Sequence, residues 1–235
     1  MRSAVKNVIF TFSLVASIAA QAISVGNVDF EKKSITGVEV ELVGSMSNDV
    51  SVCGANVGGF YCSASEMTGV QIGGLVSVCG NEINGIQIGG FGSECTNEVN
   101  GIQIGGLVSA CTNEVNGIQV GGCGSWCENE VNGIQIGGLS SFCRKEVNGI
   151  QIGGIWCGAG KVRGVQIAGL FSAGDKISGL QIGAINYFIK DVSGVQIGVF
   201  NYAGEKSDNC LQIGVVNWLS ANETMKIVPF VNFRF

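Results

Sequence analysis

Histidine is absent from this 235-residue chain, and proline occurs only once. The lack of histidine removes the side chain most often used as a general base and as a transition-metal ligand. Charged residues make up only 13% of the sequence, and the formal net charge is −5. Nucleic acid is not expected as a partner, because neutralising phosphates requires clustered lysine and arginine. With 46% hydrophobic residues, the chain is too apolar for an intrinsically disordered protein.

Long hydrophobic runs are also missing, apart from one near the N-terminus. Arg2 and Lys6 precede an apolar segment over residues 8–20, and a small-x-small cleavage site ends at Ala22. About 13 apolar residues fall short of the ~20 that are needed to span a bilayer as a helix. We therefore predict that residues 1–22 are a signal peptide and that the chain is exported.

Glycine is abundant, with 38 residues, and much of it belongs to one tandem repeat. The unit Gly101–Leu107 (GIQIGGL) recurs along the chain, and its central glutamine returns every 15 or 16 residues. These glutamines are Gln71, Gln87, Gln103, Gln119, Gln135, Gln151, Gln166, Gln181, Gln196 and Gln212. Such a period indicates one continuous array. We divide the exported chain into a lead-in over residues 23–36, tandem repeats over 37–220 and a C-terminal strand over 221–235.

The repeat predicts an all-β protein, because each unit is rich in β-branched residues and punctuated by glycine. With the glutamine as position 0, apolar residues occupy positions −4, −1, +1 and +4. They can share one core only if the chain bends, and Asn-Gly and Gly-Gly are suitable corners. We predict a repetitive β-solenoid of about 12 short coils. Its core would hold these apolar residues with Ser and Cys at +6 and +8, while outward glutamines and asparagines form ladders.

An antiparallel outer-membrane β-barrel of about 12–14 strands is the alternative, because the unit also fits a membrane strand of about 9–11 residues plus a turn. The tail supports it: Ile227, Val231, Phe233 and Phe235 share one strand face, and a terminal phenylalanine resembles the sorting signal of such barrels. The solenoid is favoured because a coil can be added freely, whereas one added barrel strand reverses all that follow. The segment 221–235 then either caps the solenoid or closes the barrel.

Ten cysteines in an exported chain raise the question of disulfides. Five of them share position +8, namely Cys79, Cys95, Cys111, Cys127 and Cys143. In a solenoid they would form a column, either as buried small hydrophobic side chains or with partial disulfide pairing. Metal binding is not expected, because the sequence has no histidine and no C-x-x-C pair. We predict no cofactor either.

Position −5 is occupied by glutamate in six successive units. These residues are Glu66, Glu82, Glu98, Glu114, Glu130 and Glu146. Solvated turn charges are the favoured interpretation, and Ca²⁺ bound by carboxylate oxygens is the alternative. The Gly-x-Gln-x-Gly-Gly run is not a phosphate loop, since no lysine follows it. The sequence shows no combination of nucleophile, base and orienting group, so we predict that the chain has no catalytic residues and is not an enzyme.

The later units and the chain's end resemble a family of bacterial surface-repeat proteins. The resemblance lies in tandem Gly-[Val/Ile/Leu]-Gln-Ile-Gly units, such as Gly194–Tyr202 (GVQIGVFNY), and in the ending Pro229–Phe235 (PFVNFRF). It covers residues 37–235 and implies an exported protein of the cell surface or outer membrane rather than the periplasm. We therefore expect a structural or partner-binding scaffold that meets an envelope or extracellular protein or glycan. A pore or structural membrane protein is the function that goes with the barrel.

Overall fold

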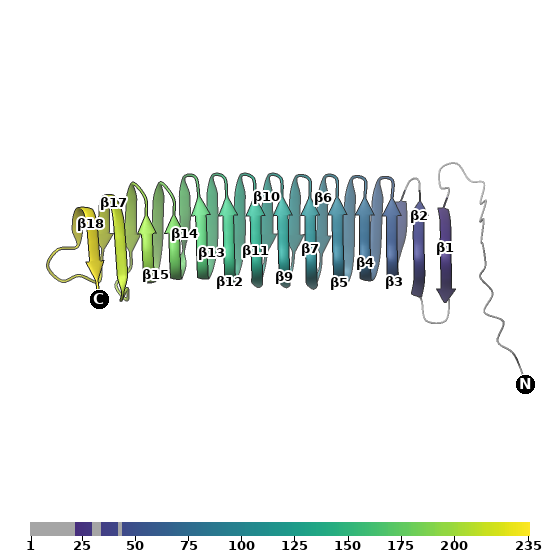
Figure 1. Cartoon of the computed structure of the whole chain (residues 1–235), viewed down its shortest axis with the longest axis horizontal. Helices are drawn as coiled ribbons and strands as arrows, with labels where there is room; N and C mark the ends of the chain where they lie inside the picture. Colours follow the sequence, from purple (N-terminus) through teal and green to yellow (C-terminus); the bar gives the residue numbers. More distant parts are fainter. Residues whose placement is uncertain (1–21, 30–33, 42–43) are drawn as a thin grey trace, which may run out of the picture.

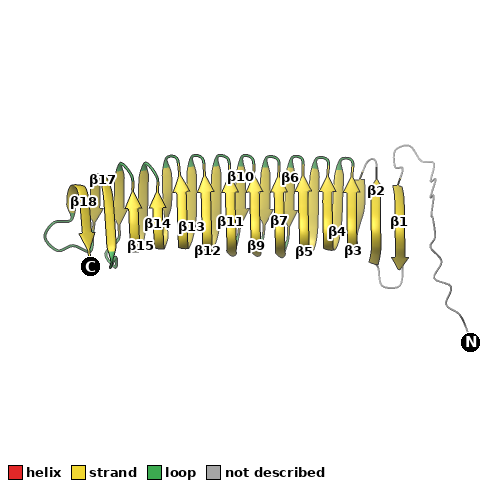
Figure 2. Ribbon diagram, in the orientation of Figure 1, coloured by secondary structure: helices red, strands yellow, loops and turns green. Residues whose placement is uncertain are grey.

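The computed structural model describes residues 22–29, 34–41 and 44–235. These residues form an all-β solenoid of about 11 turns, close to the predicted 12. Figure 1 shows the strands side by side in one long row, with β1 at one end and β18 at the other. Figure 2 shows that the described elements are strands joined by loops. The expected signal peptide, residues 1–22, lies outside the described residues apart from Ala22.

Both long and short strands follow the 15- to 16-residue period. Their bounds are β1 (Ala22–Asp29), β2 (Ser34–Glu41), β3 (Gly44–Gly58), β4 (Tyr61–Gly73), β5 (Val76–Gly89), β6 (Gly92–Cys95), β7 (Glu98–Gly105), β8 (Val108–Cys111), β9 (Glu114–Gly121), β10 (Gly124–Cys127), β11 (Glu130–Gly137), β12 (Ser140–Gly153), β13 (Trp156–Ala168), β14 (Phe171–Ile182), β15 (Ile185–Ile197), β16 (Phe200–Ala203), β17 (Cys210–Leu219) and β18 (Ile227–Arg234).

One coil consists of a long strand, a tight turn, a short strand and a second turn. In a typical coil, β7 is followed by the turn at Gly106–Leu107, then by β8 and the turn at Thr112–Asn113. In several other coils the short strand and the next long strand are continuous, as in β5 and β12. The coil therefore has two layers, a long-strand layer and a short-strand layer, joined by a turn at each edge.

Neighbouring coils pair in parallel and in register. Gln103 of β7 pairs with Gln119 of β9, and Cys111 of β8 pairs with Cys127 of β10. A membrane barrel built from these units would pair successive strands antiparallel. The barrel alternative is therefore wrong.

The Gly-Gly pair forms a corner, as predicted, but Asn-Gly does not. The strand β7 runs without a break from Glu98 through Asn100 and Gly101 to Gly105. Gly101 has φ 138°, which only glycine adopts without strain. The second corner lies instead at positions +9 and +10, such as Thr112 and Asn113. Both corners are built from glycine or small polar residues, which suits tight turns.

The prediction of which side chains face inward was wrong at four positions, namely −1, 0, +1 and +4. All ten repeat glutamines are fully buried, whereas Ile102 and Ile104 on either side of Gln103 are half-buried on the outer face. Leu107 at the turn is exposed. Valine or isoleucine at −4, serine at +6 and cysteine at +8 are buried, as predicted. Side chains alternate along the long strand as in an ordinary strand, so −4 and 0 face the same side.

Reversed strands stand at both ends of the stack. At the N-terminal end β1 pairs antiparallel with β2. At the C-terminal end β18 pairs antiparallel with β17, and Asn232 lies opposite Gln212. Each reversed strand occupies the hydrogen-bonding edge that the next coil would otherwise use.

Candidate functional site

The interior of the solenoid is a polar column of glutamines. Gln103 Nε2 donates to Gln87 Oε1 at 2.9 Å and to Ala110 O at 2.9 Å. Gln103 Oε1 accepts from Gln119 Nε2 at 3.0 Å and from Ser109 Oγ at 3.0 Å. A buried amide is stable when its donors and acceptors are satisfied in this way. The column therefore serves as core, and among its described glutamines only Gln212, at the C-terminal end, has a buried side-chain oxygen without a hydrogen-bond partner.

The cysteine column lines the corner opposite the Gly-Gly turn. Cys111 Sγ lies 3.2 Å from Glu114 O and 3.4 Å from Asn97 O, and the other four members repeat this arrangement. All ten cysteines lie in the described part of the chain and are free thiols, so partial disulfide pairing is wrong. Only Cys53 and Cys123 are exposed.

Five of the buried thiols resist ionisation. Burial raises the pKa of Cys62, Cys157 and Cys210 to about 12. In the column, hydrogen bonding with neighbouring thiols together with burial raises the pKa of Cys95 and Cys127, whereas hydrogen bonding with a neighbouring thiol lowers the pKa of Cys79, Cys111 and Cys143. Because the thiolate is the reactive form, the five thiols with a raised pKa are poor nucleophiles.

One edge of the solenoid, which we call the polar edge, consists of the second turn and the first positions of the long strand. The six glutamates at −5 form a column there, as predicted. Asn116 Nδ2 donates to Glu98 Oε1 at 2.9 Å and to Asn100 Oδ1 at 3.1 Å, and this pattern repeats along the edge. The column ends where Lys161 and Arg163 pair with Glu146.

The carboxylates of the polar edge are spaced as a ladder and do not converge on one point. Within the described ranges, no group of three or more Cys, Asp or Glu side chains is arranged to hold a metal ion. The geometry of the carboxylates therefore does not support the alternative that they bind Ca²⁺. What the edge does provide is the same Glu–Asn pair in four successive coils.

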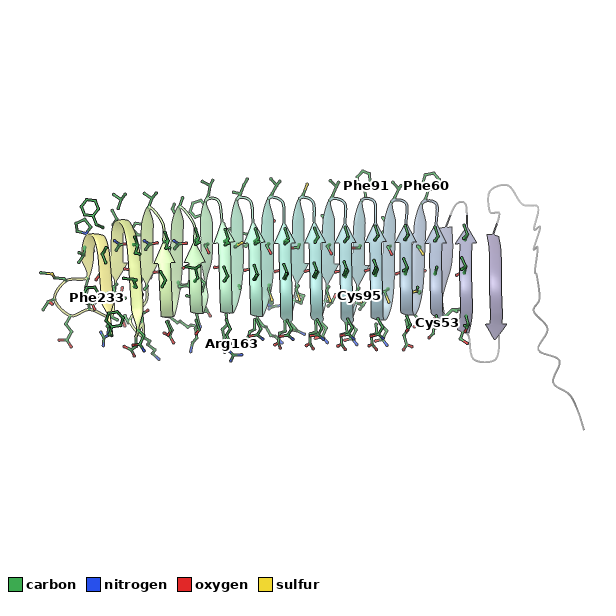
Figure 3. All side chains as sticks on the ribbon, viewed as in Figure 1. Cys53, Phe60, Phe91, Cys95, Arg163 and Phe233 are labelled. Atoms are coloured by element: carbon green, nitrogen blue, oxygen red, sulfur yellow. The ribbon has the colours of Figure 1, made fainter. Side chains whose placement is uncertain are left out.

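The opposite edge carries a continuous line of apolar side chains at the Gly-Gly turns. We call this line the apolar ridge. It consists of Phe60, Leu75, Phe91, Leu107, Cys123, Leu139, Ile155, Leu170, Ala184, Val199 and Val215. Phe91 is 57% exposed and Leu139 52%. Figure 3 shows Phe60 and Phe91 projecting from this edge, while Cys53 and Arg163 lie at the other.

Apolar side chains continue from the ridge onto both outer faces. The long-strand face carries two aliphatic columns, at positions −1 and +1, exemplified by Ile102 and Ile104. The short-strand face carries two aromatic stacks. Trp126, Phe142 and Trp156 form one, with ring centroids 4.4 and 5.5 Å apart. Tyr187, Tyr202 and Trp218 form the other, with centroids 4.7 and 5.6 Å apart.

A shallow depression separates the two aromatic stacks on the short-strand face. It has a volume of about 360 Å³ and lies where Gly158 and Ala173 replace the aromatic residues of the neighbouring coils. Phe142 and Tyr187 line it, and Arg144 stands at its rim. No sequence pattern predicted it, because it arises from two small residues that the register brings side by side.

The apolar ridge was missed by the sequence analysis for one reason. The residue at +4 was assigned to the core because it is apolar, although it follows a glycine pair that places it at the tip of a turn. Among the described residues, no helix is long and apolar enough to cross a bilayer.

No family model, curated protein or solved structure matches this chain. The resemblance to bacterial surface-repeat proteins therefore stays a prediction from the motifs.

Proposed function

We propose that the chain is an exported, non-enzymatic protein of the cell envelope that acts as a structural or partner-binding scaffold. The observation that carries this proposal is the repetition of one surface along the rod. Glu98 and Asn116 form a pair that recurs in the coils on either side of it, through Glu82 with Asn100 and Glu114 with Asn132. Identical groups at a fixed spacing suit a repetitive or extended partner better than a single small substrate.

The absence of histidine from the sequence and the hydrogen-bonded interior support the non-enzymatic part of the proposal. The thiols that could serve as nucleophiles are mostly buried, and burial disfavours the thiolate. The N-terminal pattern of residues 1–22 supports export. A place at the cell surface or outer membrane, with a protein or glycan partner, follows from the motif resemblance.

Labelling of intact cells tests the location. On intact cells, a membrane-impermeant maleimide should label the native chain at the exposed Cys53, which lies toward the polar edge, and N-terminal sequencing should begin at Ile23. The double variant Cys53→Ser/Cys123→Ser should not be labelled, because the other cysteines are buried. A chain that keeps residues 1–22 and reacts only after cell lysis would refute the proposal.

A further inference from the structure

The distribution of charge divides the solenoid lengthwise. Between Glu66 and Asp191, every charged residue except Glu94 lies in the second turn or in the first positions of the long strand, at the polar edge. The apolar ridge and the columns beside it are otherwise free of charge over these coils. This is the arrangement of an amphipathic element, with an apolar and a polar side running its whole length.

We propose that the apolar ridge and the columns beside it insert edge-on into the acyl layer of a lipid membrane, with the polar edge in water. The lipid layer would be the partner of the envelope scaffold proposed above. Which membrane the chain meets in the cell rests on that proposed function. The ability to enter a lipid layer does not depend on export and can be measured on its own.

The shape of the apolar surface favours lipid over a second copy of the chain. Apolar side chains cover three contiguous sides, with Ile104 on the long-strand face, Leu107 at the ridge and Val108 on the short-strand face. A flat sheet from a second solenoid would cover one face and leave the convex ridge in water. Fluid acyl chains can cover all three sides at once.

The kinds of side chain also change with distance from the ridge. On the short-strand face, the column nearer the ridge includes Phe171, Ile185 and Phe200 together with Tyr61 and Trp156. The next column out holds four of the chain's six tryptophans and tyrosines, namely Trp126, Tyr187, Tyr202 and Trp218. Tryptophan and tyrosine favour the headgroup region, where one end of the ring is apolar and the other wet.

The indole of Trp126 shows this orientation directly. Its Nε1 donates to Glu128 Oε1 at 2.9 Å, toward the polar edge. Trp126 follows the ridge residue Cys123 by three residues, and strand residues rise about 3.3 Å each, so the aromatic column lies at most about 10 Å from the ridge. That matches the depth of about 5–10 Å to which interfacial amphipathic elements are buried.

The two exposed cysteines provide a matched pair of probes. Cys123 lies on the apolar ridge, and Cys53 lies toward the polar edge. An environment-sensitive maleimide dye is attached to Cys123 in the Cys53→Ser chain, and to Cys53 in the Cys123→Ser chain. Each is mixed with zwitterionic phosphatidylcholine vesicles carrying nitroxides on the acyl chains. The dye reports the surroundings of the residue that carries it. Membrane binding through residues 1–22, if they are retained, would therefore not imitate insertion of the ridge.

The proposal predicts a blue shift and strong acyl-nitroxide quenching for the dye at Cys123, with neither for the dye at Cys53. Equal quenching at both sites, or quenching at neither, would overturn it. If Cys53 is not labelled in intact cells while the dye at Cys123 is quenched by vesicles, the cellular location is refuted but lipid insertion stands.

A pair of double variants tests the ridge itself. Phe91→Asp/Leu107→Asp places two charges on the ridge, and Thr96→Asp/Thr112→Asp places the same two charges in the second turns of the same coils. We expect the ridge variant to partition into the vesicles about tenfold or more weakly, and the control to bind as the unaltered chain does. Far-ultraviolet circular dichroism confirms that both keep their strands.

Self-association is the competing outcome. If sedimentation without lipid gives a dimer that the ridge variant abolishes and the control keeps, and Cys123 is not quenched by vesicles, the ridge is an interface between copies and the lipid proposal is wrong.

Discussion

The side-chain amide of Gln103 donates to the side-chain carbonyl of Gln87 in the preceding coil at 2.9 Å, and both residues are fully buried. This contact is repeated from coil to coil, so the centre of the rod is a hydrogen-bonded polar column. The aliphatic residues next to each glutamine face outward in consequence, because side chains alternate along a strand.

Two substitutions at adjacent positions, Gln103→Ile and Ile104→Gln, test which of the two side chains faces the interior of the solenoid. Gln103→Ile leaves Gln87 Oε1 without its donor and Ser109 Oγ without its acceptor, so we expect it to lower the free energy of unfolding by roughly 2–4 kcal/mol. Ile104→Gln, one residue away on the outer face, should cost less than about 1 kcal/mol. Denaturant titration followed by circular dichroism measures both, and a larger loss for Ile104→Gln would show that the isoleucines form the core.

The strand glycines at −2 are needed for the close stacking of the coils. A Cβ built on Gly101 would lie 2.1 Å from Gly85 O, and the residue has φ 138°. Gly101→Ala must therefore push the coils apart and strain the backbone, and we expect a loss of about 2 kcal/mol or more.

Gly92 provides the matched control for that substitution. A Cβ at Gly92 meets Val108 O at 3.6 Å, an ordinary contact. Gly92→Ala should change the unfolding midpoint little and could raise it slightly, since alanine reduces the freedom of the unfolded chain. Equal losses at both positions would contradict the stacking geometry.

The thiols should fall into two classes in labelling experiments. In the native protein only Cys53 and Cys123 should react with a maleimide at neutral pH, and all ten cysteines should react after denaturation. Mass spectrometry of the labelled chain counts the adducts. Rapid labelling of Cys111 or Cys127 in the native state would show that the column is open to solvent.

The same thiols predict how stability depends on pH. Burial raises the pKa of Cys62, Cys157 and Cys210 from 9.0 to about 12, so these groups ionise more easily in the unfolded chain. Their contribution is fully present below pH 9.0 and is lost as pH rises toward 12, by up to about 1.4 kcal/mol per thiol and pH unit. Cys157→Ala should reduce the slope of unfolding free energy against pH in this window, and an unchanged slope would argue against burial of that thiol.

The repeat period was sufficient to predict the solenoid. A step of 15 or 16 residues between glutamines such as Gln103 and Gln119 requires equivalent positions in successive units, and parallel stacking provides them. The columns of glutamate and cysteine follow from the same period. The reversed pairing of β18 did not follow from it, because the terminal segment lies outside the repeat.

The residues that face inward and outward were predicted wrongly because the hydrophobicity of each residue was given more weight than the alternation of side chains along a strand. Val99 and Gln103 lie four residues apart, so in a straight strand they face the same side, and burying Val99 buries Gln103. A corner at Asn100–Gly101, as predicted from the Asn-Gly pair, would have let Val99 and Gln103 face opposite sides. A glycine with φ near 138° keeps the strand continuous there, and no local pattern distinguishes that conformation from a turn.

Predicting the apolar ridge requires two facts together, the corner at Gly-Gly and the strict alternation of side chains along the long strand. Leu107 follows Gly105 and Gly106, so it lies at the tip of the turn rather than in a strand. The aromatic stack of Tyr187 and Tyr202 depends on a turn that is one residue shorter in the late coils, and the register there is set by tertiary pairing.

Spacing along the ridge tests the stacked architecture most directly. Spin labels are placed on the Cys53→Ser/Cys123→Ser chain through Leu75→Cys with Leu139→Cys, and through Leu75→Cys with Leu170→Cys. The backbone of the ridge is hydrogen-bonded from coil to coil, from Leu75 through to Leu170. Parallel coils at ~4.8 Å therefore predict electron–electron distances of about 19 Å for the first pair and about 29 Å for the second. Distances that do not grow by about 5 Å per coil, or that place the two pairs at equal separation, would contradict the solenoid.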